Sequence, residues 1–126
     1  MVVTGVDIIE VERIRKNIED YGENFLNKIY TEKEIRYCES KIAHKFESYS
    51  ARFAAKEAVF KAVSSLLKNK FEIDWKNIEI INDENGKPYV NLILNDVLVD
   101  LQKIKNIDIS ISHVKELAIA SCVLEY

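Results

Sequence analysis

A single stretch of sixteen residues, 52–67, constrains the fold more than any other feature of this sequence. It reads RFAAKEAVFKAVSSLL, and its many strong helix formers predict a helix. Apolar residues occur all around this helix, which is typical of a helix that is largely buried. The same stretch carries charged residues, and a buried charge needs a partner or a ligand. A fold for this chain must therefore bury the helix and satisfy its embedded charges: Arg52, Lys56, Glu57 and Lys61.

The elements expected around this helix alternate irregularly between strands and helices. An apolar, β-branched run at residues 2–9 predicts a strand, and helical spacing then continues up to Gly22. Thr31 and Glu34 have the spacing of a capping box, which predicts the start of a short helix. The long helix is expected to end near residue 67. Further strands are expected at residues 78–82, 89–94, 107–111 and 117–124, and a helix at 97–104.

This order favours an α+β fold over a doubly wound parallel sheet. We expect one domain, residues 1–126, in which a mostly antiparallel sheet packs on one long helix with short accessory helices. The turn at residues 83–86 predicts a hairpin, and Pro88 belongs at the start or edge of its second strand.

Composition excludes several classes of function. The chain has 126 residues, 48% of them hydrophobic, so disorder is not expected. A net charge of −3 argues against a nucleic-acid partner bound through bulk charge. Cys38 and Cys122 lack metal-site spacing and are expected to be free thiols. The first residues become acidic too early for a signal peptide, and no apolar run would cross a membrane. We therefore expect a cytoplasmic protein without a membrane partner.

Four features could carry chemistry, and each also has a structural interpretation. Asp7, near the end of the first strand, is either a helix N-cap or a functional carboxylate. Glu57 and Lys61 share a helix face and could simply pair. His113 has the parity of the preceding isoleucines, so it lies either at the core edge or in a cleft. The residues Asn85–Pro88 favour a turn without any function, but Gly86 would also let a ligand approach the backbone closely.

Taken together, these features supply two carboxylates and several cations. Mg²⁺ takes one or two carboxylates and completes its shell with phosphate oxygens and water. Lysine and arginine neutralise the remaining phosphate charge. The set is therefore suited to phosphoryl chemistry on a polyphosphate ligand.

The motifs resemble those of the 4′-phosphopantetheinyl transferases, in that family's order. The matching stretches are Gly5-Val6-Asp7, the ten residues 52–61, residues 85–88 and Ser110-Ile111-Ser112-His113. The length fits the small, single-domain type, the holo-acyl-carrier-protein synthases. The resemblance implies an enzyme that moves phosphopantetheine from coenzyme A to a serine of an apo-acyl carrier protein, in support of fatty acid biosynthesis. Adenosine 3′,5′-bisphosphate would leave.

The resemblance also implies roles for individual residues. Asp7 and Glu57 would be Mg²⁺ ligands and, with Lys61, the catalytic residues. Coenzyme A would be bound by Arg52, Lys56, Lys61, Gly86, Lys87, Pro88 and His113. The acyl carrier protein would dock on the first helix through Arg13, helped by Arg15 and Lys16, although that helix also carries many acidic residues.

The resemblance further implies a homotrimer with active sites at subunit interfaces. Asp7 and Arg13 of one subunit would lie beside Glu57 or His113 of its neighbour. Strands that are apolar on both faces agree with this, since they need cover on both sides. Cover by the helix at residues 97–104 of the same chain is the alternative.

Other functions stay open at this point. The carrier could belong to polyketide or peptide synthesis. A non-catalytic coenzyme A module would not need Asp7 and Glu57 together, and in a purely structural oligomer Asp7 would cap a helix. The acceptor of the serine proton is either a water molecule or one of the carboxylates, and the sequence does not choose.

Overall fold

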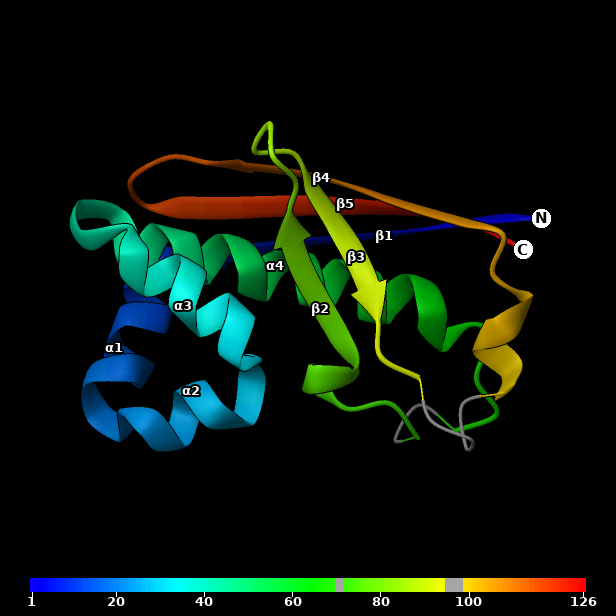
Figure 1. The fold of residues 1–126 in the computed structure, drawn as a ribbon, viewed down its shortest axis with the longest axis horizontal. Helices are drawn as coiled ribbons and strands as arrows, with labels where there is room; N and C mark the ends of the chain where they lie inside the picture. The colour runs from blue at the N-terminus through cyan, green and yellow to red at the C-terminus, as the bar shows by residue number, and fades with distance from the viewer. Residues whose placement is uncertain (70–71, 95–98) are drawn as a thin grey trace.

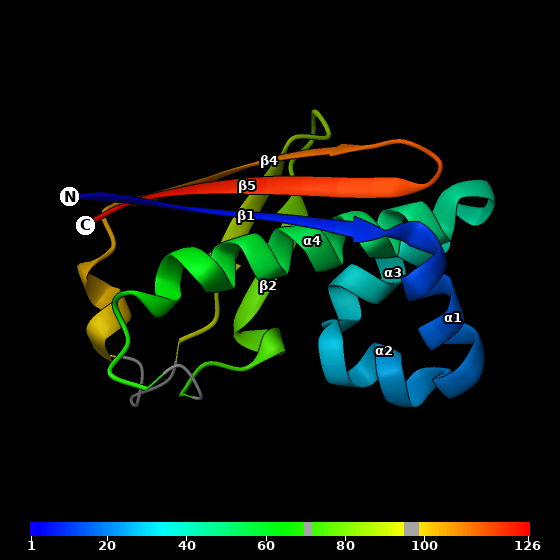
Figure 2. The same ribbon diagram turned by 180° about the vertical axis from the view of Figure 1, so that it is seen from behind.

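The computed structural model describes residues 1–69, 72–94 and 99–126. Its long helix, α4 (Lys45–Ser64), lies along one face of a three-stranded antiparallel sheet with the order β1-β5-β4 (Figures 1 and 2). The strands of this sheet are β1 (Val2–Glu10), β4 (Asn106–His113) and β5 (Leu117–Glu125). The expected α+β class and the sheet on one long helix are confirmed.

The close packing of β1 on α4 requires a glycine. A Cβ atom at Gly5 would collide with the backbone carbonyl of Ala58, so the strand reaches the helix backbone directly. Along β5, side chains alternate strictly between buried and exposed positions. The inner face therefore packs on α4, while apolar side chains on the outer face of the sheet stay exposed: Val2, Val6, Ile8, Leu117, Ile119 and Val123.

Three short helices gather at one end of α4 (Figure 1): α1 (Val11–Tyr21), α2 (Glu23–Ile29) and α3 (Glu32–Ser40). Gly22 ends α1 as predicted, with φ 54°, and its N–H donates to the Ile18 carbonyl at 2.8 Å. The predicted capping box is also present, because Thr31 and Glu34 bond each other's backbone N–H groups. Helix α2 was not expected from the sequence. A 3-10 turn, η1 (Ile42–His44), joins α3 to α4.

The second sheet is the predicted hairpin of β2 (Ile78–Asn82) and β3 (Pro88–Leu92), preceded by the 3-10 turn η3 (Trp75–Asn77). Gly86 has φ 83° in the connecting turn, and Pro88 begins β3 as expected. Strand β3 ends at Leu92 and α4 at Ser64, both earlier than predicted. In place of the helix expected at residues 97–104, the structure has a 3-10 turn, η4 (Val99–Lys103); Val97 and Leu98 lie outside the described residues.

None of the described helices is both long enough and apolar enough to cross a membrane.

One buried ion pair joins α3, α4 and β2. The Lys56 ammonium lies 2.6 Å from Glu34 Oε1 and 2.6 Å from the Ile78 carbonyl oxygen, and both charged side chains are fully buried. Glu34 Oε2 accepts the backbone N–H of Ile80 at 2.9 Å. Burial lowers the pKa of Lys56, and the Glu34 carboxylate opposes this shift. The pair therefore fixes the position of β2 relative to two helices.

We expect Lys56→Met to lower the free energy of unfolding by about 3–5 kcal/mol, because it leaves the Glu34 carboxylate buried and unpaired. Urea unfolding followed by circular dichroism measures this. Lys103→Met is the matched control, since Lys103 is 66% exposed and pairs with Asp100 at the surface. Its effect should stay below about 1 kcal/mol. Equal effects of the two substitutions would contradict a stabilising role for the buried pair.

Candidate active site

Two carboxylates line a cavity of about 440 Å³ between β1, the first two helices and α4. Asp7 projects from β1 and Glu57 from α4, and Arg13 of α1 lines the same cavity. The apolar part of the wall includes Phe53 and Trp75. This acidic cavity therefore brings together Asp7 and Glu57, which are fifty residues apart in the sequence, from a single chain.

Lys61 lies at the acidic cavity as the partner of Asp7. Its ammonium is 3.1 Å from Asp7 Oδ1 and 2.9 Å from the carbonyl oxygen of Val6. Among the ion pairs of the described residues, Lys61 pairs with Asp7 and not with Glu57. Asp7 is not a helix cap either, because the N-cap of α1 is Glu10, which makes no side-chain capping bond. Both structural interpretations considered for these residues are therefore wrong.

The pKa of Glu57 is raised above its ordinary value. Burial is the main cause, and the nearby Asp7 carboxylate adds to it, while Lys61 acts in the opposite direction. The two carboxylates at one cavity repel each other, and Lys61, paired with Asp7, offsets part of this repulsion, while Arg13 and Lys28 line the same cavity.

The acidic cavity fits the needs of a hard divalent cation. Mg²⁺ is commonly held by one or two carboxylates, with the other positions filled by substrate oxygens and water. Asp7 and Glu57 supply these two carboxylates. In the described part of the chain, no group of three or more histidine, cysteine, aspartate and glutamate side chains could hold a metal. Asp7 and Glu57 are therefore the two acidic ligands that this cavity offers to a metal ion.

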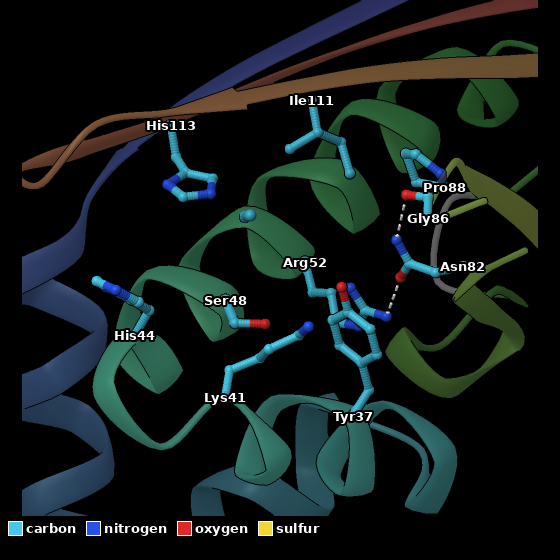
Figure 3. A pocket seen from close by; sticks show the side chains of 11 residues that line it. Tyr37, Lys41, His44, Ser48, Arg52, Asn82, Gly86, Pro88, Ile111 and His113 are labelled. Carbon is cyan, nitrogen blue, oxygen red and sulfur yellow. Dashed lines mark hydrogen bonds between the residues drawn. The ribbon is translucent and has the colours of Figure 1, made fainter. Parts of the chain in front are cut away.

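A second cavity, of about 400 Å³, is basic. Figure 3 shows Arg52 of α4 at its base, with His113 and Ile111 of β4 above it and Gly86 and Pro88 of the hairpin turn at one side. The basic and acidic cavities share no lining residue, and α4 is the element that contributes to both. The remaining walls of the basic cavity come from Tyr37, Lys41, His44, Ser48, Ala51 and Asn82.

Arg52 is buried, with only 4% of its surface exposed, and it is incompletely paired. Its guanidinium lies 3.9 Å from the centre of the Tyr37 ring, and one Nη donates to Asn82 Oδ1 at 2.6 Å. Its Nε is the one buried side-chain polar atom of the described residues without a hydrogen-bond partner. Such a buried cation, with donor capacity left over, is suited to an anionic ligand.

Comparisons with known proteins agree with this geometry. The sequence pattern of the 4′-phosphopantetheinyl transferase superfamily, ACPS, matches residues 4–122. The chain belongs to this superfamily.

Individual relatives cover nearly the whole chain. A holo-[acyl-carrier-protein] synthase of Solibacter usitatus is 44% identical over 99% of this chain and 98% of its own length. The crystal structure of the Helicobacter pylori holo-[acyl-carrier-protein] synthase in complex with coenzyme A has a TM-score of 0.82 at 27% identity, covering 98% of this chain and 100% of that one. The Bacillus anthracis synthase in complex with CoA (3′,5′-ADP) has a TM-score of 0.78 at 36% identity, covering 98% and 96%.

In this member of the superfamily, the candidate residues separate into groups. Asp7, Glu57, Lys61 and Arg13 gather at the acidic cavity, and Arg52, Gly86, Pro88 and His113 line the basic one. His113 thus lines a cleft, one of the two alternatives for it. Lys87 lies exposed in the adjoining turn, and Arg15 and Lys16 are exposed on α1.

Lys56 does not fit the role expected for it. It lies on the same helix as Arg52, but its ammonium is in the core, bonded to Glu34, and has no exposed surface. The sequence pattern identified a buried charge that needs a partner, and the structure provides a partner within the protein. Five polar or aromatic residues of the basic cavity were missed, because they carry no motif of their own: Tyr37, Lys41, His44, Ser48 and Asn82.

The raised pKa of Glu57 has a consequence for stability. A carboxyl group whose pKa is raised by folding destabilises the folded state at any pH where it is ionised, and this cost is lost as the pH falls below its ordinary value of 4.5. In metal-free buffer at pH 7, we therefore expect Glu57→Gln to raise the melting temperature by about 1–3 °C. The gain should disappear below pH 4.5. Glu12→Gln, at an exposed site on α1, is the control; a lower melting temperature for Glu57→Gln at pH 7 would contradict the argument.

Proposed function

We propose that this chain transfers 4′-phosphopantetheine from coenzyme A to a serine of apo-acyl carrier protein. The pyrophosphate bond of coenzyme A breaks, and adenosine 3′,5′-bisphosphate leaves. The serine hydroxyl gives its proton to a water molecule or to one of the carboxylates, and its oxygen bonds to the phosphorus that carries the pantetheine arm. The main support is the acidic cavity, in which Asp7 and Glu57 of one chain lie beside Lys61. We further propose that the reaction serves fatty acid biosynthesis in the cytoplasm.

The basic cavity is the proposed site of the nucleotide end of coenzyme A. Arg52 and His113 would bind its phosphate groups, because they bring cationic or hydrogen-bonding groups to one cavity. Gly86, Lys87 and Pro88 would lie beside the nucleotide. Lys41, which follows α3, and His44, the last residue of η1, add further donors on the opposite wall. Lys56 is left out of this proposal, since its ammonium is buried against Glu34.

Asp7 and Glu57 would hold Mg²⁺, which when bound neutralises pyrophosphate charge. Lys61 keeps Asp7 in place and adds positive charge where the leaving phosphate develops negative charge. Phe53 and Trp75 form an apolar part of the wall beside these groups, while Lys61 stays half exposed.

The carrier protein would approach over α1. Arg13 is the main candidate contact, because it is exposed and lines the acidic cavity next to the proposed reaction centre. Arg15 is partly engaged, since it pairs with Glu12 at 3.4 Å and its guanidinium lies over the Phe46 ring. Arg15 and the exposed Lys16 would therefore assist docking. Charges at such a rim mainly steer the encounter.

We also propose that the chain forms a homotrimer with active sites shared between subunits. The outer face of β1 and β5 exposes Val6, Ile8 and Ile119, each more than 40% exposed, and no described segment covers them. An apolar face of this kind fits a protein–protein interface. In this trimer, a site would join the acidic cavity of one subunit to the basic cavity of its neighbour.

The metal assignment predicts that Asp7→Ala and Glu57→Ala each reduce transfer at least about 1,000-fold while the fold is kept. Mass spectrometry of the carrier after incubation with coenzyme A and Mg²⁺ measures the added phosphopantetheine. Asp100→Ala, a carboxylate paired with Lys103 away from both cavities, is the control. Transfer near the wild-type rate by either folded variant would exclude that residue from the reaction.

The shared site predicts which inactive chains can complement each other. Co-expressed Asp7→Ala and His113→Ala chains should regain up to roughly a quarter of wild-type activity, the fraction of interfaces that pair two intact cavities in random trimers. Asp7→Ala with Glu57→Ala should show no rescue, because both changes affect the same cavity. Sedimentation velocity checks the trimer. Full activity in a strictly monomeric sample would contradict the shared site.

A further inference from the structure

Asn82 connects two walls of the basic cavity. Its Oδ1 accepts a hydrogen bond from an Nη of Arg52 at 2.6 Å, and its Nδ2 donates to the carbonyl oxygen of Gly86 at 3.0 Å (Figure 3). One side-chain amide therefore links the cation at the base of the cavity to the turn at its side.

The partners of Arg52 are neutral. Its guanidinium is held by the Asn82 amide and by the face of the Tyr37 ring, and no carboxylate pairs with it among the described residues. A carboxylate would orient Arg52 equally well but would compete with an anionic ligand for its charge. An amide fixes the direction of the guanidinium and leaves the full positive charge for the ligand.

The turn on the other side also needs support. The Asp83 carboxylate accepts the backbone N–H groups of Asn85 and Lys87, and Gly86 has φ 83°. These bonds shape the turn but do not attach it to the rest of the cavity. The bond from Asn82 to the Gly86 carbonyl joins the turn to a side chain that also holds Arg52, in addition to the backbone pairing of Asn82 with Pro88 across the hairpin.

We propose that Asn82 is a positioning residue for coenzyme A, which holds the Arg52 guanidinium and the Gly86 turn in one fixed arrangement. The inference rests on the proposed function, because it takes the basic cavity as the nucleotide site. Asn82 acts through Arg52 and the turn and leaves the acidic cavity untouched. Its loss should therefore weaken binding of coenzyme A without slowing the chemical step.

The first test is Asn82→Ala. We expect KM for coenzyme A to rise about 10-fold, with kcat and KM for the carrier within about 2-fold of wild type. Asn91→Ala is the matched control. It removes one amide-to-side-chain bond, to Glu79, on the neighbouring strand outside the cavity, so KM for coenzyme A should not change. An equal rise for both variants, or none for Asn82→Ala, would overturn the proposal.

Asn82→Asp separates positioning of the ligand site from general stability. The carboxylate would pair with Arg52 more strongly but cannot donate to the Gly86 carbonyl oxygen, so the melting temperature should lie near that of Asn82→Ala. KM for coenzyme A should nevertheless rise at least as much, because the carboxylate competes with the ligand for the guanidinium charge. Wild-type KM for Asn82→Asp would overturn the proposal even if the alanine variant failed to fold.

A double-mutant cycle tests whether Asn82 acts through Arg52. In an Arg52→Gln background, Asn82→Ala should raise the dissociation constant of coenzyme A by clearly less than the roughly 10-fold expected with Arg52 present, because only the bond to the Gly86 turn is then lost; calorimetry measures this. An undiminished 10-fold effect there would overturn the proposed route. If the wild-type protein neither bound coenzyme A nor modified the carrier, the proposed function itself would fail; binding by wild type with an unaffected Asn82→Ala variant would exclude only the role of Asn82.

Discussion

The arrangement of this protein depends on the burial of one charge, the Lys56 ammonium. A lysine in the middle of a core helix must find acceptors, and here it finds the Glu34 carboxylate and the Ile78 carbonyl. Glu34 also accepts the N–H of Ile80, so the position of β2 is tied to α3 and α4. Asn82 follows two residues later on β2. The location of the basic cavity therefore depends on an ion pair that lies outside it.

Lys56 and Glu57 are adjacent in the sequence of α4 but lie in different environments. Lys56 is fully buried and satisfied by the protein, whereas Glu57 faces a cavity with a second carboxylate. The sequence reveals that both charges sit in an apolar helix and need partners. It does not reveal which one is satisfied internally, because Glu34 is 22 residues away from Lys56 and nothing in the local spacing connects them.

Local patterns predicted most of the fold. An apolar, β-branched run indicated the first strand, a turn sequence indicated the hairpin, and the Thr31 capping box and Gly22 marked helix ends correctly. Helix α2 was not predicted because Gly22 is both the C-cap of α1 and the N-cap of α2. A glycine indicates the end of a helix, and nothing in the sequence indicated that another helix begins directly after it. For the site, the family motifs identified Asp7, Glu57 and Arg52. Tyr37 and Asn82 line the basic cavity only because distant segments of the chain pack around α4. No periodic pattern in the sequence predicts that packing.

The division between the two cavities has a consequence for how such a sequence can diverge. The basic cavity draws on α3, the start of α4, the hairpin turn and β4, while the acidic cavity draws on β1, the first two helices and η3. A change in the hairpin turn leaves the acid pair intact, and a change in α2 leaves the turn intact. Only α4 belongs to both cavities and to the core at once. The residues of each cavity can therefore change independently of the other cavity in related chains. The sequence of α4 should vary least, because it serves both cavities and the core.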